Sequence, residues 1–170
     1  MENKLPVRKP NRLENYDYSS CGAYFLTICT AGRENYFWNS VGATIGRPQD
    51  VKLSQYGKIA EKAINNIPEK YPSLSVDQYV IMPDHIHLLI TICADENGRP
   101  MVAPTMSRVV QQTKGYITKH IRHSIWQKSF FDHIIRNRED YEKHLKYIFE
   151  NPIRWQYDKL YIKEWISKKQ

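Results

Sequence analysis

Two histidines, His85 and His87, stand one residue apart inside the apolar run that spans residues 79–90. The run is rich in β-branched residues and is typical of a buried strand. Because side chains at i and i+2 of a strand point to the same face, the two imidazoles project together. Two imidazoles on a rigid strand can bind one metal ion. The alternative is two unrelated histidines, since so short a motif also arises by chance.

A second group of polar residues falls on a helix that we predict from residue 138 to about residue 151. At about 100° per residue, its apolar face consists of Tyr141, Leu145 and Ile148, and the polar stripe a quarter-turn away consists of Asp140, His144, Tyr147 and Asn151. Tyr147 and Asn151 are four residues apart, so their side chains meet on one face. An amide oxygen one turn from a phenol could complete a metal site while the phenol approaches the same ion.

The elements that must position these residues follow a recognisable order. The patterns predict strands at 23–30, before Pro83, at 86–93 and at 126–136, and helices from Ser54 to Pro68, at 106–123 and at 138–151, the last with Asn137 as N-cap. This β-α-β-β-α-β order with a final helix indicates an α+β fold of the ferredoxin-like, split βαβ type, an antiparallel sheet with two helices on one face. We expect Ile86, Leu88 and Ile90 to pack on those helices. His85 and His87 then face the open side, which is left for a ligand or for the C-terminal helix.

Charge and length limit the classes of function. The chain of 170 residues carries 25 Lys and Arg against 18 Asp and Glu, a formal charge of +7, and such a surface favours polyanions, nucleic acid first. The three cysteines form no Cys-x-x-Cys pair, so neither a disulfide framework nor a thiolate zinc site is indicated. No run is long enough to cross a bilayer and no signal peptide is recognisable, so we expect a cytoplasmic protein.

One domain is expected from this length. Its predicted limits are residues 21–158, with a polar arm at 1–20 and a tail at 159–170. In the arm, Tyr16 and Tyr18 either stack on unpaired bases or pack on the domain. The positive side chains on the predicted helix at 106–123 either form a solvated face or contact backbone phosphates. They are Arg108, Lys114, Lys119 and Arg122.

Several short motifs, taken in order, resemble those of the REP-associated tyrosine transposases, which are single-tyrosine histidine–hydrophobic–histidine (HUH) transposases of bacteria. The matching segments are residues 80–90, 126–127, 132–137 and 147–155. Each motif is unspecific alone, but their order and spacing match from about Gly22 to Trp155, nearly the whole chain. The resemblance therefore implies a fold, an activity and a set of site residues.

By this resemblance, the protein cleaves single-stranded DNA at hairpin-associated sites. Tyr147 is the implied nucleophile, which becomes linked to the 5′ phosphate and releases a 3′ hydroxyl. His85 and His87 are the implied ligands of a divalent metal, Mg²⁺ or Mn²⁺, with Asn151 as the third. Relatives have a glutamine one turn after the tyrosine, so the asparagine of this chain is shorter by one methylene. Asp84 and His144 are candidates to support the metal ligands. The alternative for Asp84 is a turn residue, and the alternative for His144 is a solvated histidine on the helix.

Two other functions fit the same residues. A ferredoxin-like sheet with aromatic residues can be a non-catalytic module that binds single-stranded nucleic acid. A metal-dependent phosphoesterase would use an activated water molecule and would form no covalent intermediate. For the partner, the expectation is single-stranded or hairpin DNA. Transposases of this kind also work as homodimers, so a homodimer is compatible with the resemblance.

Overall fold

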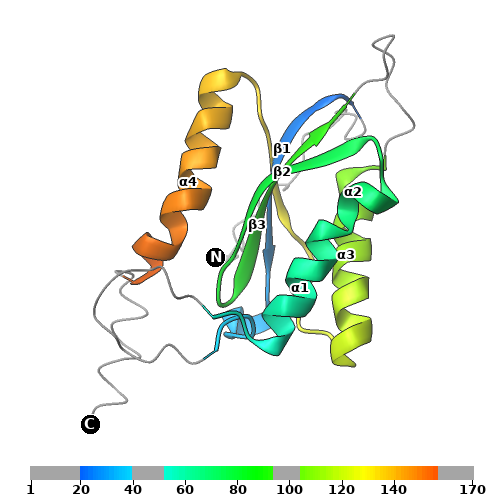
Figure 1. Cartoon of the computed structure of the whole chain (residues 1–170), viewed down its shortest axis with the longest axis vertical. Helices are drawn as coiled ribbons and strands as arrows, with labels where there is room; N and C mark the ends of the chain where they lie inside the picture. Colours follow the sequence, from blue (N-terminus) through cyan, green and yellow to red (C-terminus); the bar gives the residue numbers. More distant parts are fainter. Residues whose placement is uncertain (1–19, 40–51, 94–103, 157–170) are drawn as a thin grey trace, which may run out of the picture.

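The protein, seen in a computed structural model that describes residues 20–39, 52–93 and 104–156, has an antiparallel sheet with helices on both faces (Figure 1). Its strands are β1 (Gly22–Cys29), β2 (Leu74–Ile81), β3 (His85–Ile92) and β4 (Phe131–Ile134), and its helices are α1 (Gln55–Asn65), α2 (Ile67–Lys70), α3 (Met106–Ile121) and α4 (Arg138–Gln156), with a 3-10 turn at Ala31–Arg33. The strand order β2-β3-β1-β4 leaves β1 and β2 on either side of β3, with every neighbouring pair antiparallel. This is the split βαβ arrangement, so the predicted α+β fold is confirmed.

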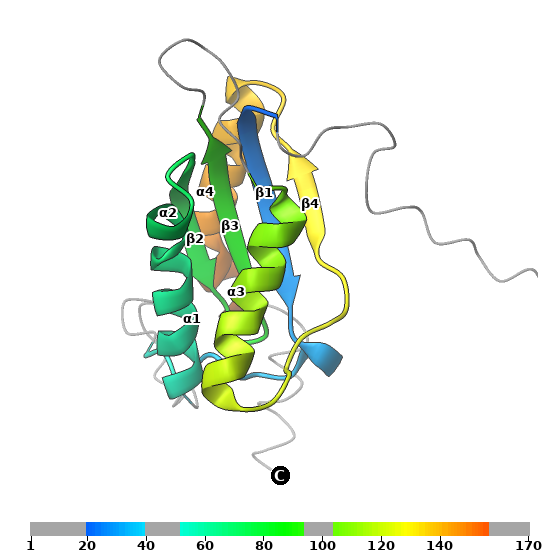
Figure 2. The same ribbon diagram turned by 90° about the vertical axis from the view of Figure 1, so that its right-hand side faces the viewer.

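The two faces of the sheet have different covers. Figure 2 shows α1 and α3 side by side on one face and α4 behind the other. The alternation predicted from the sequence is confirmed on the helical face, where Ile86, Leu88 and Ile90 of β3 are buried in the main core with residues of α1 and α3. On the opposite face, Phe25 and Leu89 pack against Ile148 of α4 in a smaller apolar cluster. The face expected to carry the histidines is therefore covered by the C-terminal helix.

The first helix begins where the sequence predicts. The hydroxyl of Ser54 accepts a hydrogen bond from the backbone N–H of Gly57 at 3.1 Å, which satisfies one free donor of the first turn. The predicted end at Pro68 is wrong, because α1 stops at Asn65 and Pro68 lies in the first turn of the short helix α2. A proline is tolerated there because the first-turn N–H groups have no partner within the helix.

The last strand and the last helix differ in length from the prediction. The strand expected at 126–136 is only four residues long, and Trp126 forms an isolated bridge with Thr30 instead. The N-cap is confirmed, since the Asn137 side chain accepts from the backbone N–H of Asp140 at 2.9 Å. The predicted stop at Asn151 is wrong, because α4 continues through Pro152.

The packing of the last turn explains why α4 continues. Proline inside a helix costs about 3 kcal/mol, because it lacks an N–H and its ring clashes with the preceding turn. Trp155, three residues later, packs against the main core, with its ring 5.5 Å from that of Trp38. Burial of large aromatic side chains contributes free energy of the same order. Tertiary packing therefore outweighs the local preference at Pro152.

Candidate functional site

His85 and His87 lie at the start of β3, on the face of the sheet that α4 covers. They are 7 % and 4 % exposed, and their ring centroids are 4.6 Å apart. The register of the sheet pairs His87 with Thr27 and His85 with Cys29 on the neighbouring strand β1. Strand geometry thus brings the two imidazoles together, as the sequence predicts.

Each of the two rings uses its Nδ1 atom for a contact with the protein. Nδ1 of His87 lies 2.9 Å from the hydroxyl oxygen of Thr27, and Nδ1 of His85 lies 2.5 Å from a carboxylate oxygen of Asp84. The second oxygen of Asp84 pairs with Nε of Arg33 at 3.2 Å. Nε2 of each ring is therefore the atom that can bind a ligand. Supported imidazoles of this kind are typical of metal sites.

Burial, with a smaller effect of the nearby charges of His85, Arg33 and His144, lowers the pKa of His87 from its ordinary 6.5 to about 3. The ring is therefore neutral at physiological pH, which is the form that binds metal. Its buried Nε2 has no hydrogen-bond partner among the described residues. An unsatisfied buried nitrogen costs about 1–3 kcal/mol, and a bound metal ion would relieve that cost.

The helix α4 brings the predicted tyrosine to the histidines. The ring of Tyr147 lies edge-on to His87, with 5.2 Å between centroids, and 5.9 Å from the ring of Phe25. One turn later, Asn151 is 7 % exposed, and its Nδ2 is also buried without a partner in the described chain. The amide nitrogen and oxygen exchange places by a half-turn of the side chain, so this position suits an oxygen ligand. The buried Ile148 between them anchors the helix.

Tyr147 and the two histidines line one cleft of about 1140 Å³. Other lining residues are Phe25, Thr27, Cys29, Gly32, Arg33, Asn35, Asp84, Phe131, Lys143, His144, Lys146, Glu150, Asn151, Arg154 and Trp155. Four of the residues in the lining are cationic and two are acidic, and Glu150 is paired with Lys146 at 3.6 Å and with Arg154 at 2.5 Å. The excess of positive charge favours an anionic ligand such as a phosphodiester.

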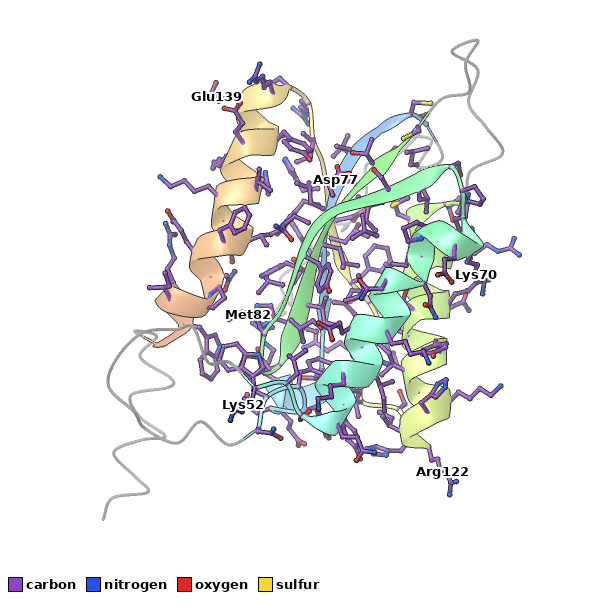
Figure 3. The ribbon with its side chains drawn as sticks, viewed as in Figure 1. Lys52, Lys70, Asp77, Met82, Arg122 and Glu139 are labelled. Carbon is purple, nitrogen blue, oxygen red and sulfur yellow. The ribbon has the colours of Figure 1, made fainter. Side chains whose placement is uncertain are left out.

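The other predicted DNA contacts lie elsewhere. Arg108, Lys114 and Lys119 belong to α3 and Arg122 is its C-cap, on the side of the sheet away from α4. Figure 3 shows Arg122 pointing outward from the end of α3, on the opposite side of the molecule from Glu139 of α4.

Within this group, Lys114 is engaged inside the fold, where its ammonium donates to the carbonyl oxygens of Gln127 and Ser129 at 2.8 and 3.0 Å. Burial lowers the pKa of Lys114. Tyr16 and Tyr18 lie outside the described residues.

Two supports of the site were not predicted from the sequence. Thr27 contacts His87 because of the pairing register between β1 and β3, which no local pattern reveals. Arg33 is the last residue of the 3-10 turn and has a positive φ of 59°, which is uncommon for a residue other than glycine and often marks a functional position. Asp84, one of the two residues expected to support the metal ligands, contacts both His85 and Arg33 through its carboxylate.

Comparison with known proteins finds relatives that align with most of the chain. No family model matches it. It is 30% identical over 174 residues to an uncharacterised protein of Haemophilus influenzae. The alignment covers 91% of this chain and 93% of that protein. A second H. influenzae protein, assigned as a REP-associated tyrosine transposase, is 26% identical over 90% of this chain and 83% of its own length. A REP-associated tyrosine transposase of Escherichia coli is 27% identical over 64% of this chain and 61% of that protein.

Among solved structures, the chain is similar to a REP-associated tyrosine transposase bound to a REP hairpin. The TM-score is 0.60 with 23% identity, covering 87% of this chain and 77% of the other. The likeness shows that the two chains share their fold. In the part of this chain that the structure describes, no helix is long and apolar enough to cross a membrane.

Proposed function

We propose that this chain, which belongs to the REP-associated tyrosine transposase family, nicks and rejoins single-stranded DNA through a covalent bond to Tyr147. The observation that carries this proposal is the edge-on contact between the rings of Tyr147 and His87. It joins a potential nucleophile on α4 to a pair of potential metal ligands on β3. These two halves are sixty residues apart in the sequence, and their meeting supports one catalytic centre.

The residues of the cleft fit a divalent metal ion. His85 and His87 would hold it through Nε2, and Asn151 through its amide oxygen, a mixed set that suits Mn²⁺ or Mg²⁺. The unsatisfied buried atoms of His87 and Asn151 support this assignment. When bound, the ion would neutralise charge on the scissile phosphate and help to orient it. The ligand set keeps positions open for phosphate and water.

Tyr147 would attack the phosphorus atom of the scissile phosphodiester. The bond from phosphorus to the 3′ oxygen breaks, and the strand leaves with a free 3′ hydroxyl. The 5′ phosphate stays on the tyrosine, which conserves the energy of the broken bond. A 3′ hydroxyl then attacks the phosphotyrosine and restores both the strand and the phenol, with no need for ATP. Lys143 and Arg33, which line the cleft, would hold the phosphates on either side.

A hairpin substrate is suggested by the related transposase whose solved structure contains a REP hairpin. The formal charge of +7 is compatible with such a polyanion. The α3 cations Arg108, Lys119 and Arg122 lie on the side of the sheet away from the cleft, so we assign them to a distant, paired part of the DNA.

The test is a covalent trapping assay. Overlapping single-stranded oligonucleotides covering the DNA that flanks the gene of this chain are incubated with the protein and Mn²⁺ or Mg²⁺. We expect a protein–DNA adduct that resists denaturation, that is lost in Tyr147→Phe and that EDTA prevents. Tyr141→Phe is the matched control, because Tyr141 lies on the same helix but its hydroxyl bonds to Asp77 instead, at 3.0 Å.

The alternatives give different results in the same assay. A binding module would retain its affinity for DNA in the presence of EDTA and in His85→Ala, and would form no adduct. A phosphoesterase would cut the strand in Tyr147→Phe as fast as in the wild type. Either result would refute the tyrosine mechanism.

A further inference from the structure

Three ionisable side chains that the proposed reaction does not use meet near the start of α4. His133 of β4 places its Nε2 2.8 Å from one carboxylate oxygen of Asp140, and His144 places its Nδ1 3.2 Å from the other. The backbone N–H of Arg136 donates to the first oxygen at 3.2 Å. Asp140 thus contacts two imidazoles, whose rings stack with 4.6 Å between centroids, and its carboxylate is fixed from several directions.

The contacts of His144 decide which ring nitrogen carries its hydrogen. Nδ1 lies 2.8 Å from the backbone carbonyl oxygen of Asp140, and a carbonyl oxygen can only accept. The carboxylate of Asp140, at 3.2 Å from the same nitrogen, accepts as well. The hydrogen of the neutral ring is therefore on Nδ1, and the lone pair is on Nε2. This is the tautomer of a general base oriented by a carboxylate.

A metal ion is the competing occupant of this cluster. Ligand atoms of His133, Asp140 and His144 lie within 4.8 Å of one another, a spacing that an ion could bridge. However, a ring nitrogen that carries a hydrogen has no lone pair for a metal. Nδ1 of His144, the nitrogen that contacts Asp140, donates to a carbonyl oxygen and so cannot bind an ion there. The cluster is therefore better explained as a hydrogen-bonded network than as a second metal site.

His144 is also close to the nucleophile of the proposed reaction. It precedes Tyr147 by three residues, so both side chains lie on one face of α4, and both line the cleft. Both rings pack on Phe25, with centroids at 4.7 Å for His144 and 5.9 Å for Tyr147. A phenol with an ordinary pKa near 10 is almost wholly protonated at neutral pH, so its attack requires a proton acceptor.

We propose that His144, oriented by Asp140, is the general base that accepts the phenolic proton of Tyr147, directly or through one water molecule. The role rests on the proposed tyrosine chemistry. As the oxygen of Tyr147 bonds to phosphorus, its proton moves to Nε2 of His144 and the imidazolium is stabilised by the Asp140 carboxylate. The bond to the 3′ oxygen breaks, and that oxygen takes a proton from water. In rejoining, the departing phenolate takes the proton back from His144. His133 holds Asp140 in place.

The experiment measures the rate of adduct formation with the oligonucleotide that the wild type modifies. General-base catalysis contributes about 10²–10⁴-fold to a rate, so we expect a loss in this range for His144→Gly. Added imidazole should restore part of the rate of His144→Gly and leave the wild type unchanged. The restored rate should rise with the basicity of the substituted imidazole that is added. The matched control is His133→Gln, which changes the other histidine on Asp140 and should reduce the rate much less.

Several outcomes would overturn this role. One is loss of activity in His144→Gly that imidazole does not restore, although the variant unfolds cooperatively and binds DNA as the wild type does. If His144→Gly does not fold, His144→Gln is used instead, because it preserves the bulk of the side chain. A rate of adduct formation in His144→Gln within threefold of the wild type refutes the role of His144 as general base. Mn²⁺ or Zn²⁺ binding that depends on His133 would instead identify a metal site. A wild type that forms no adduct refutes the proposed function itself and this role with it.

Discussion

At the scale of single residues, the two histidines of β3 are distinguished by what supports them. His85 contacts a carboxylate, which can only accept, so its Nδ1 carries the hydrogen and its Nε2 is free to bind. His87 contacts the hydroxyl of Thr27, which can donate or accept. Metal binding at Nε2 of His87 requires Nδ1 to carry the hydrogen, and Thr27 must then accept it. The threonine hydroxyl is therefore predicted to tune metal affinity without touching the ion.

This role of Thr27 is tested by a matched pair of substitutions. Thr27→Val keeps the shape of the side chain but removes the acceptor, so we expect Mn²⁺ affinity to fall by about 10–100-fold. Thr27→Ser keeps the hydroxyl and should bind Mn²⁺ within a few-fold of the wild type. Calorimetric titration of Mn²⁺ into metal-free protein measures both. Equal affinities for the valine variant and the wild type would contradict the prediction.

The pKa of His87, lowered by burial to about 3, predicts a dependence of stability on pH. Below pH 6.5, His87 binds a proton in the unfolded chain but stays neutral in the folded chain. The free energy of unfolding therefore decreases as the pH falls from about 6.5 to about 3. Above 6.5 this contribution is constant. The full loss is at most about 5 kcal/mol, since each unit of pKa difference corresponds to about 1.4 kcal/mol.

The measurement is urea unfolding in EDTA at pH 7, 5 and 4, for the wild type and for His87→Gln. Other groups titrate in both proteins, so the difference between them isolates the histidine. We expect the wild type to lose more stability than the variant on acidification. Parallel pH profiles would show that His87 does not supply this dependence.

At the scale of elements, α4 is the part that completes the site. Its inner face is apolar, with Ile148 2 % exposed against Phe25 and Leu89, and the adjacent stripe presents Tyr147 and Asn151 to the cleft. The apolar cluster beneath α4 is smaller than the core on the other side of the sheet. The position of the nucleophile therefore depends on a small number of buried contacts.

A substitution in this cluster should undock the helix. Ile148→Ala removes buried methyl groups and should lower the free energy of unfolding by about 2–4 kcal/mol, with a loss of adduct formation. Phe149→Ala is the matched control, because the side chain of Phe149 is 61% exposed and its removal should change stability by no more than about 0.5 kcal/mol. Thermal unfolding and the trapping assay give the two readouts. The idea fails if Ile148→Ala traps DNA as fast as Phe149→Ala.

At the scale of the whole molecule, the positive charge is divided between two sides of the sheet. Lys143 and Lys146 line the cleft beside α4, whereas Lys119 and Arg122 lie on the α3 side. A short unpaired strand at Tyr147 can reach only the first pair. A hairpin has the length to reach both. The length of the DNA should therefore decide which cations matter.

This division predicts two salt dependences. For an unpaired octamer, Lys143→Gln combined with Lys146→Gln should flatten the slope of log affinity against log salt by about 1.4, since each contact to a single strand contributes about 0.7. Lys119→Gln combined with Arg122→Gln should leave the octamer unaffected and weaken only a hairpin-bearing oligonucleotide. Fluorescence anisotropy at several salt concentrations measures each affinity. An octamer that responds to the α3 pair would contradict the assignment.

The sequence by itself determined what depends on neighbours along the chain. The two-residue period of a strand placed His85 and His87 on one face, and the helical period placed Tyr147 beside Asn151, since both follow from local backbone geometry. The element order also predicted the sheet. Tertiary structure alone decided that α4 covers the histidine face, that Thr27 pairs with His87, that Lys114 is engaged within the fold, and that α4 continues past Pro152 because Trp155 packs on the core. These outcomes depend on contacts between segments far apart in the sequence, where burial and register outweigh local preference.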